Sequence, residues 1–74
     1  MKLEPGKHYR MRNGGEMRVY ADDAWGAYPI HGAVYVAPYW SVYGWTIDGQ
    51  FIFMSRLQHG HDIISEMPEA EWTK

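Results

Sequence analysis

The chain contains no cysteine among its 74 residues. This excludes disulfide bonds and thiolate metal sites, and it is typical of proteins that work in a reducing compartment such as the cytoplasm. No stretch approaches the ~18 consecutive apolar residues that a membrane-spanning helix needs. Residues 1–6 lack the hydrophobic segment of a signal peptide. We therefore expect a soluble, cytoplasmic protein with no membrane partner.

The net charge is also small, and the charged residues are unevenly distributed. The net charge is −2, with five Lys/Arg against two Glu in residues 1–20 and two Lys/Arg against seven Asp/Glu in residues 21–74. This asymmetry can form an anion-binding patch or orient one subunit against another. It does not supply the broad basic face that binding of duplex nucleic acid requires. We therefore exclude duplex nucleic acid as a partner.

Aromatic residues, by contrast, are abundant. The chain has 4 Trp, 6 Tyr and 2 Phe, which amount to 16% of its residues. Each aromatic side chain can bury about 150–250 Å², and a single domain of this length has little interior in which to hide them. Several aromatic side chains should therefore serve an interface or a ligand, and we expect a homo-oligomer.

The strongest structural signal lies in residues 43–54, where two β-prone segments flank Asp48-Gly49. This dipeptide favours a two-residue hairpin turn. Such a hairpin has two apolar faces, so we expect one to cover the core and the other to contact a second subunit. We assign Phe51 and Phe53 to the subunit interface. The face assigned to the core comprises Tyr43, Trp45, Ile52 and Met54.

A first hairpin is expected from the alternating residues 8–12, followed by the turn residues 13–15. A three-residue loop with Gly15 in the left-handed conformation sorts apolar from polar residues onto separate faces. It places Arg10 opposite Arg18, either as solvated side chains that splay apart or with an anion between them. The apolar pairs that it predicts are Met11 with Met17 and Tyr9 with Val19.

The remaining segments complete an all-β prediction. We expect a third strand at residues 28–36, with Pro29 at an edge or just ahead of the ladder and Gly32 at a bulge or a close backbone approach. Residues 37–41 should form a connection. A last strand at residues 62–67 ends at Pro68.

The predicted fold is a small antiparallel, strongly bent sheet or open barrel of five or six strands built from hairpins. Residues 1–67 form a single β domain. Residues 68–74 form an acidic C-terminal tail, which we expect to be frayed, although Trp72 could dock on a neighbour.

No catalytic or metal-binding constellation is evident. His59 and His61 with Asp62 are suitable ligand types, but a two-residue spacing with no third histidine nearby does not define a metal site. We predict no metal and no cofactor. Trp25, in the connection at residues 21–27, could close over the edge of the core or stack on a ligand. His31 could be a hydrogen-bonded structural residue or a contact to a ligand.

Four short blocks of sequence resemble a set of small, poorly characterised proteins of bacteriophages and prophages. The blocks are Leu3…Gly6-x-x-Tyr9-Arg10-x-Arg12-x-Gly14, Tyr28-Pro29-Ile30-His31-Gly32, Trp45-x-x-Asp48-Gly49 and Asp62-Ile63-Ile64-x-Glu66. The chain departs from the set at the turn of residues 13–15, where Asp-Gly is usual, and at Ile63-Ile64, where a leucine often stands. The resemblance implies an accessory protein that counters host defence by gripping a host protein or sequestering a nucleotide signal.

Three functions are therefore expected, in this order. The first is a non-enzymatic phage binding protein that sequesters a small nucleotide-like signal, with aromatic rings for the base and arginines for phosphate. The second is a protein–protein inhibitor of a host factor, and the third is a hydrolase that acts on such a signal. The candidate ligand contacts are Arg10, Arg18, Trp25, Tyr28, His31 and Trp40.

Overall fold

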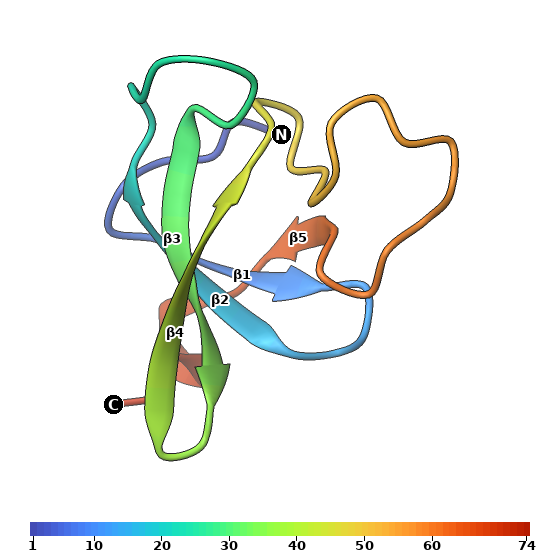
Figure 1. The fold of residues 1–74 in the computed structure, drawn as a ribbon. Helices are drawn as coiled ribbons and strands as arrows, with labels where there is room; N and C mark the ends of the chain where they lie inside the picture. The colour runs from blue at the N-terminus through green and yellow to red at the C-terminus, as the bar shows by residue number, and fades with distance from the viewer.

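The computed structural model describes all of residues 1–74 as one antiparallel sheet with a short C-terminal helix (Figure 1). The elements are β1 (His8–Met11), β2 (Glu16–Ala21), β3 (Ile30–Val36), β4 (Tyr39–Trp45), β5 (Ile63–Glu66) and the 3-10 helix η1 (Glu69–Glu71).

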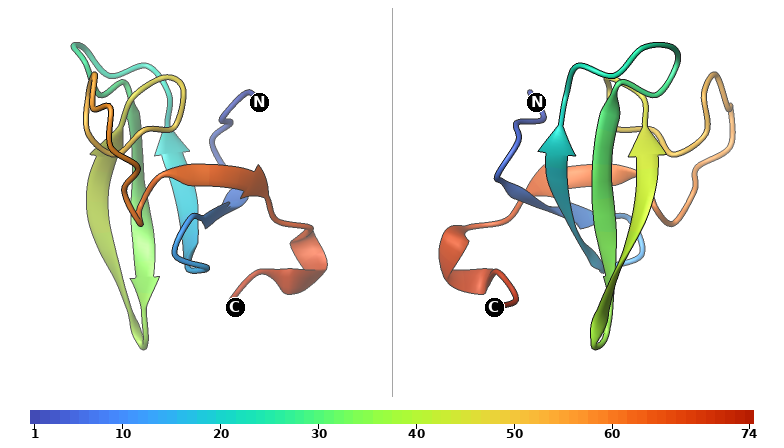
Figure 2. Two further views of the ribbon diagram at one scale, coloured as in Figure 1. Left: turned by 90° about the vertical axis from the view of Figure 1, so that its right-hand side faces the viewer. Right: turned by 60° about the vertical axis from the view of Figure 1, so that its left-hand side comes forward.

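The 5-stranded sheet has the order β4-β3-β2-β1-β5. The two end strands do not pair, so the sheet is open and does not close into a barrel. Figure 2 shows how strongly it twists, because β1 and β5 run across the direction of β3 and β4. The predicted small, bent, all-β fold is confirmed.

The β1–β2 hairpin has the predicted loop length but a different register. Three residues separate Met11 from Gly15, and the Gly15 carbonyl accepts the N–H of Met11. The left-handed residue is Gly14, with φ +86°, and not Gly15 as predicted. The register is shifted by two residues, so Arg10 lies opposite Glu16 and not opposite Arg18. A two-residue shift leaves every side chain on its predicted face. The four residues predicted for the core face, Tyr9, Met11, Met17 and Val19, are accordingly all buried.

The hairpin predicted at residues 43–54 is wrong. Asp48-Gly49 does form a turn, with Gly49 at φ +85° and its N–H bonded to the carbonyl of Thr46. The chain after this turn does not return as a strand. The Asp62 carboxylate accepts the N–H of Phe51, so this N–H cannot bond to a neighbouring strand. Strand β4 pairs instead with β3 across a two-residue turn.

That turn is Ala37-Pro38, whose peptide bond is cis. Residues 39–41 therefore belong to β4, and the connection predicted for 37–41 is only two residues long. Pro29 stands immediately ahead of β3, as expected. Gly32 makes the predicted close approach, since a Cβ there would lie 2.2 Å from the carbonyl oxygen of Arg18.

One face of the sheet carries the core. Its centre is Trp45, which is fully buried and whose indole N–H donates to the carbonyl of His61 at 2.8 Å. This bond ties the long loop between β4 and β5 to the core, and Phe51 of the loop packs against the core. The nine core residues are Leu3, Tyr9, Met11, Met17, Val19, Ile30, Val34, Trp45 and Ile63. We call the opposite face of the sheet the outer face.

Candidate functional site

The outer face carries a cluster of aromatic rings around one arginine. Side chains alternate along a strand, so the neighbours of the buried Met17 and Val34 point to this face. The guanidinium carbon of Arg18 lies 4.1 Å from the ring centroid of Trp40 and 5.2 Å from that of Tyr20. The rings of Tyr35 and Trp40 are 5.0 Å apart. We call Arg18, Tyr20, Tyr35 and Trp40 the aromatic platform.

Arg18 has no carboxylate partner, in contrast to Arg10 and Arg12. Arg10 is 3.2 Å from Glu71 and Arg12 is 3.6 Å from Asp62. The only hydrogen bond of the Arg18 side chain is donated by Nε to the hydroxyl of Tyr20, at 3.1 Å. Its two terminal nitrogens are therefore free, while the bond and the Trp40 ring fix the plane of the guanidinium. This arrangement presents an oriented, uncompensated cation at the surface.

The C-terminal tail extends the platform and is not frayed, contrary to prediction. Trp72 stacks on His8 with centroids 4.1 Å apart and planes inclined by 6°. Its indole N–H donates to the carbonyl of Met67. The His8 ring in turn meets the Trp40 ring edge-on at 5.7 Å. The tail thus docks on its own chain, whereas the sequence suggested only that Trp72 could dock on a neighbour.

Beneath Trp72 lies a buried pair, which sequence reasoning missed. His8 Nδ1 and Glu16 Oε2 are 2.6 Å apart, and Glu16 also accepts hydrogen bonds from the backbone and hydroxyl of Thr73. Burial alone would raise the pKa of Glu16, but the bonds from Thr73 and His8 outweigh it and hold the pKa below its usual value. Because Trp72 covers the His8 ring, the pair anchors the tail and is not open to a substrate.

A second polar cluster organises the long loop. Asp62 accepts the N–H groups of Phe51 and His59, both at 2.9 Å, and lies beside Arg12. Burial would raise the pKa of Asp62, but these bonds and Arg12 outweigh it, so the pKa is lowered. Burial lowers the pKa of His61, as does the nearby His59, and the buried Nδ1 of His61 has no partner.

These shifts predict acid instability. A group with a lowered pKa in the folded state stabilises the protein fully above its unfolded pKa and loses that contribution as the pH falls through the folded value. We expect the free energy of unfolding to decrease below about pH 6.5 through His61, and further below about pH 4.5 through Glu16 and Asp62. Denaturant unfolding at pH 7, 5 and 3.5 measures this.

The variant Asp62→Asn isolates the contribution of Asp62 to the second step. It should lose about 1–3 kcal/mol at pH 7 by weakening the bonds to two partly buried N–H groups, and its stability should change less than that of the wild type between pH 5 and 3.5. Equal pH dependence in the two proteins would contradict the role assigned to Asp62.

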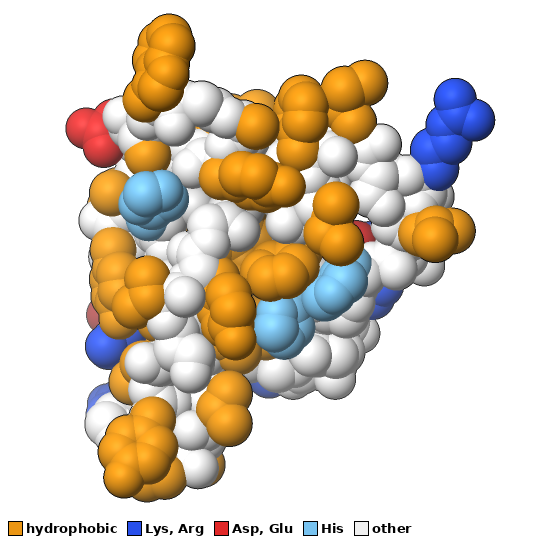
Figure 3. All heavy atoms as spheres, in the orientation of Figure 1, with side chains coloured by type: hydrophobic (Ala, Val, Ile, Leu, Met, Phe, Trp, Pro, Cys, Tyr) orange, Lys and Arg blue, Asp and Glu red, His pale blue; other side chains and the backbone are white.

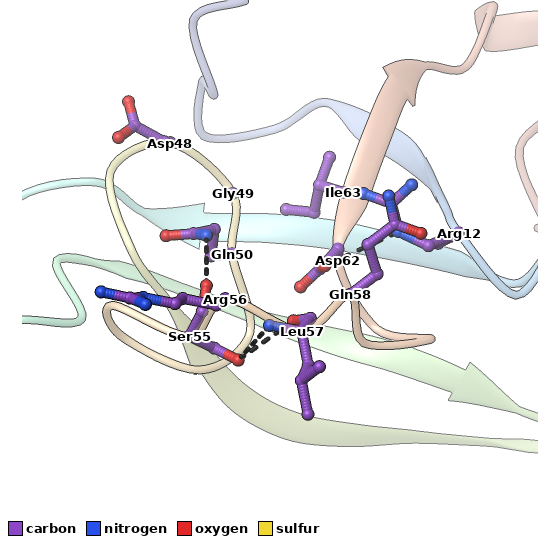
Figure 4. A pocket seen from close by; sticks show the side chains of 10 residues that line it. All are labelled: Arg12, Asp48, Gly49, Gln50, Ser55, Arg56, Leu57, Gln58, Asp62 and Ile63. Atoms are coloured by element: carbon purple, nitrogen blue, oxygen red, sulfur yellow. Dashed lines mark hydrogen bonds and ion pairs between the residues drawn. The ribbon is translucent and has the colours of Figure 1, made fainter.

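The one pocket of the molecule contains no residue of the platform, and Figure 4 shows the side chains that line it. It has a volume of about 160 Å³ and is mostly polar, with two arginines and two aspartates in its wall. Arg12 is already paired with Asp62 there, and no predicted ligand contact lines the pocket. The lining residues are Arg12, Asp48, Gly49, Gln50, Ser55, Arg56, Leu57, Gln58, Asp62 and Ile63.

The structure brings only part of the predicted ligand site together. Arg18 and Trp40 are in contact, and His31 is on the same face, next to Gly44. Arg10 is held by Glu71 and by the carbonyl of Gly14.

The other predicted contacts lie in connections. Trp25 is 100% exposed, so it does not close over the core. The hydroxyl of Tyr28 accepts the N–H of Phe53 and ties the long loop to the segment before β3. Phe53 is exposed and Phe51 half-buried, so the predicted subunit interface is divided between surface and core.

Comparison with known proteins gives no further guide to the site. No protein family, curated protein or solved structure was found that matches the chain. No helix is long and apolar enough to cross a membrane. No group of three or more His, Cys, Asp or Glu side chains is placed to hold a metal ion.

Proposed function

We propose that this chain is a non-enzymatic binding protein that takes a nucleotide-like ligand on its aromatic platform. The observation that carries the proposal is Arg18, a charged and oriented side chain without a carboxylate partner, set among the rings of Tyr20, Tyr35 and Trp40. A ligand suited to this surface combines a planar group with negative charge. Nucleotides have both.

The contacts follow from the geometry of Arg18. One face of its guanidinium covers Trp40, so the other can stack on a base, as arginine planes do in nucleic-acid recognition. Its free terminal nitrogens can donate two hydrogen bonds to a phosphate. In a phage accessory protein acting in the bacterial cytoplasm, such binding would sequester a host signal, which is the counter-defence role that the sequence resemblance suggests.

Calorimetric titration with a panel of linear and cyclic nucleotides tests the proposal. We expect heat with at least one member, and we expect Arg18→Gln to weaken binding by about tenfold or more because a charge-assisted contact is lost. Arg56→Gln is the matched control, since Arg56 is exposed, has no carboxylate partner and lies in the long loop. Uniform absence of heat, or equal loss in both variants, would refute the proposal.

A second candidate function is inhibition of a host protein. It is favoured by the absence of any pocket on the outer face, because flat surfaces with exposed aromatic side chains suit protein partners better than small ligands. A stoichiometric host partner that Trp40→Ala releases, in a protein that gives no heat with nucleotides, would establish this function in place of the first.

A further inference from the structure

Strand β4 presents a long free edge. It is the outermost strand on one side of the sheet and contains no charged residue and no proline. No backbone group of residues 39–44 is hydrogen-bonded outside the β3–β4 ladder. Val42 is 68% exposed and Tyr39 is 73% exposed. Such an edge invites pairing with another strand, because none of the usual protections is present.

The apolar surface continues around this edge. Figure 3 shows hydrophobic side chains gathered over β4 and over the tip of the β3–β4 hairpin. The other edge strand of the sheet, β5, is shorter and is partly covered.

The opposite edge is protected. Strand β5 has only four residues, includes Glu66, and has the N–H of Ile63 bonded to the carbonyl of Gly49. One end of β4 is also covered, since the Tyr28 side chain lies against Gly44 and reaches the N–H of Phe53. The open part of the molecule's edge is therefore residues 39–43 of β4.

We infer that residues 39–43 pair antiparallel with the same segment of a second copy, about a two-fold axis at Ser41. A strand without charge meets no repulsion from its own copy. Pairing of β4 with β5 of another copy would build an open chain of molecules, but β5 has too little free edge to accept it. Pairing of β4 with itself closes after two copies.

The register at Ser41 satisfies the free backbone groups. Because Val36 and Tyr39 close a two-residue turn, Trp40 and Val42 direct their N–H and C=O groups away from β3. An axis at Ser41 sets Trp40 of one copy beside Val42 of the other on the outer face. It also joins the two aromatic platforms on one side of a continuous sheet.

Measurement of solution mass tests the inference. The wild type should have twice the chain mass of 8.6 kDa. Val42→Lys should be a folded monomer, because the two lysines, each one residue from the axis, repel across it and blunt the edge. Ile64→Lys is the matched control, since Ile64 is exposed on the other edge strand, and it should remain a dimer. A monomeric wild type, or a dimer that survives Val42→Lys, would overturn the inference.

A cross-link tests the register. The chain has no cysteine, and facing residues of a non-hydrogen-bonded antiparallel pair have Cα atoms about 4.5 Å apart, which a disulfide can span. Under mild oxidation, Ser41→Cys should form a covalent dimer on a non-reducing gel, and Ser65→Cys on β5 should not. Equal cross-linking of the two variants, or none with Ser41→Cys, would exclude the proposed axis.

Discussion

Replacement of Trp45 by alanine should cost about 3–5 kcal/mol of unfolding free energy. A chain of this size has only about 4–11 kcal/mol in total, so the variant should be largely unfolded or close to it. Trp45 is the largest fully buried side chain. Its removal would leave a cavity beside Phe51 and would leave the carbonyl of His61 without its donor.

Trp25→Ala is the control for this prediction, because Trp25 is entirely exposed. Circular dichroism and denaturant unfolding should show a native Trp25→Ala protein and a strongly destabilised Trp45→Ala protein. If the two variants were equally stable, the core would not be centred on Trp45.

Gly32→Ala should be the next most damaging single change. The added methyl would lie 2.2 Å from the carbonyl oxygen of Arg18 and 3.0 Å from the Met17 side chain. A backbone oxygen cannot move aside without parting β2 from β3, so we expect a loss of about 3 kcal/mol, near the upper end for overpacking. In a domain this small, that corresponds to a fall of more than about 10 °C in Tm.

Gly60→Ala is the comparison for Gly32→Ala. Its added methyl would meet only the Asn13 side chain, at 3.3 Å or more, so its Tm should change by a few degrees. A similar Tm for both variants would show that β2 and β3 are not held as closely as the register implies.

Local pattern predicted most of the strands and the buried face of the first hairpin. The alternation of Tyr9 and Met11 determined which side chains face the core, and this assignment survived a register error because the error was an even number of residues. Gly32 was predicted as a close approach because a glycine inside a strand commonly marks a bulge or a site where another backbone comes near. The last strand was predicted at residues 62–67, ahead of Pro68, and β5 lies within this range at Ile63–Glu66.

The long loop could not be predicted because its course is set by distant residues. Asp48-Gly49 lies in a turn, but the turn has three residues, 47–49, between Thr46 and Gln50 and is not the expected two-residue turn. The Asp62 carboxylate then accepts the N–H of Phe51, eleven positions away. Ala37-Pro38, predicted as part of a connection, proved to be the hairpin turn. Residue propensities predict neither the Asp62–Phe51 bond nor the position of the hairpin turn, since both depend on tertiary structure.

The candidate site was predicted in part for the same reason. Arg18 and Trp40 were both predicted as ligand contacts from residue type. Nothing in the sequence shows that β3 lies between their strands, β2 and β4, or that the two side chains meet across it. His8 and Trp72 stand at opposite ends of the chain and come together only through the docked tail. The acidic composition of the tail indicated that it is exposed. It gave no sign of the hydrogen bonds from Thr73 to Glu16 that anchor the tail.

The central claim is that the aromatic platform binds a nucleotide-like ligand. The most direct test follows the indole N–H signals of the 4 tryptophans in a ¹H–¹⁵N spectrum while each nucleotide of the panel is added. We expect the Trp40 signal to shift in a saturable way, with a smaller change at Trp72, and we expect the exposed Trp25 and the buried Trp45 to stay in place. A shift confined to Trp25, or no shift with any nucleotide, would contradict the claim.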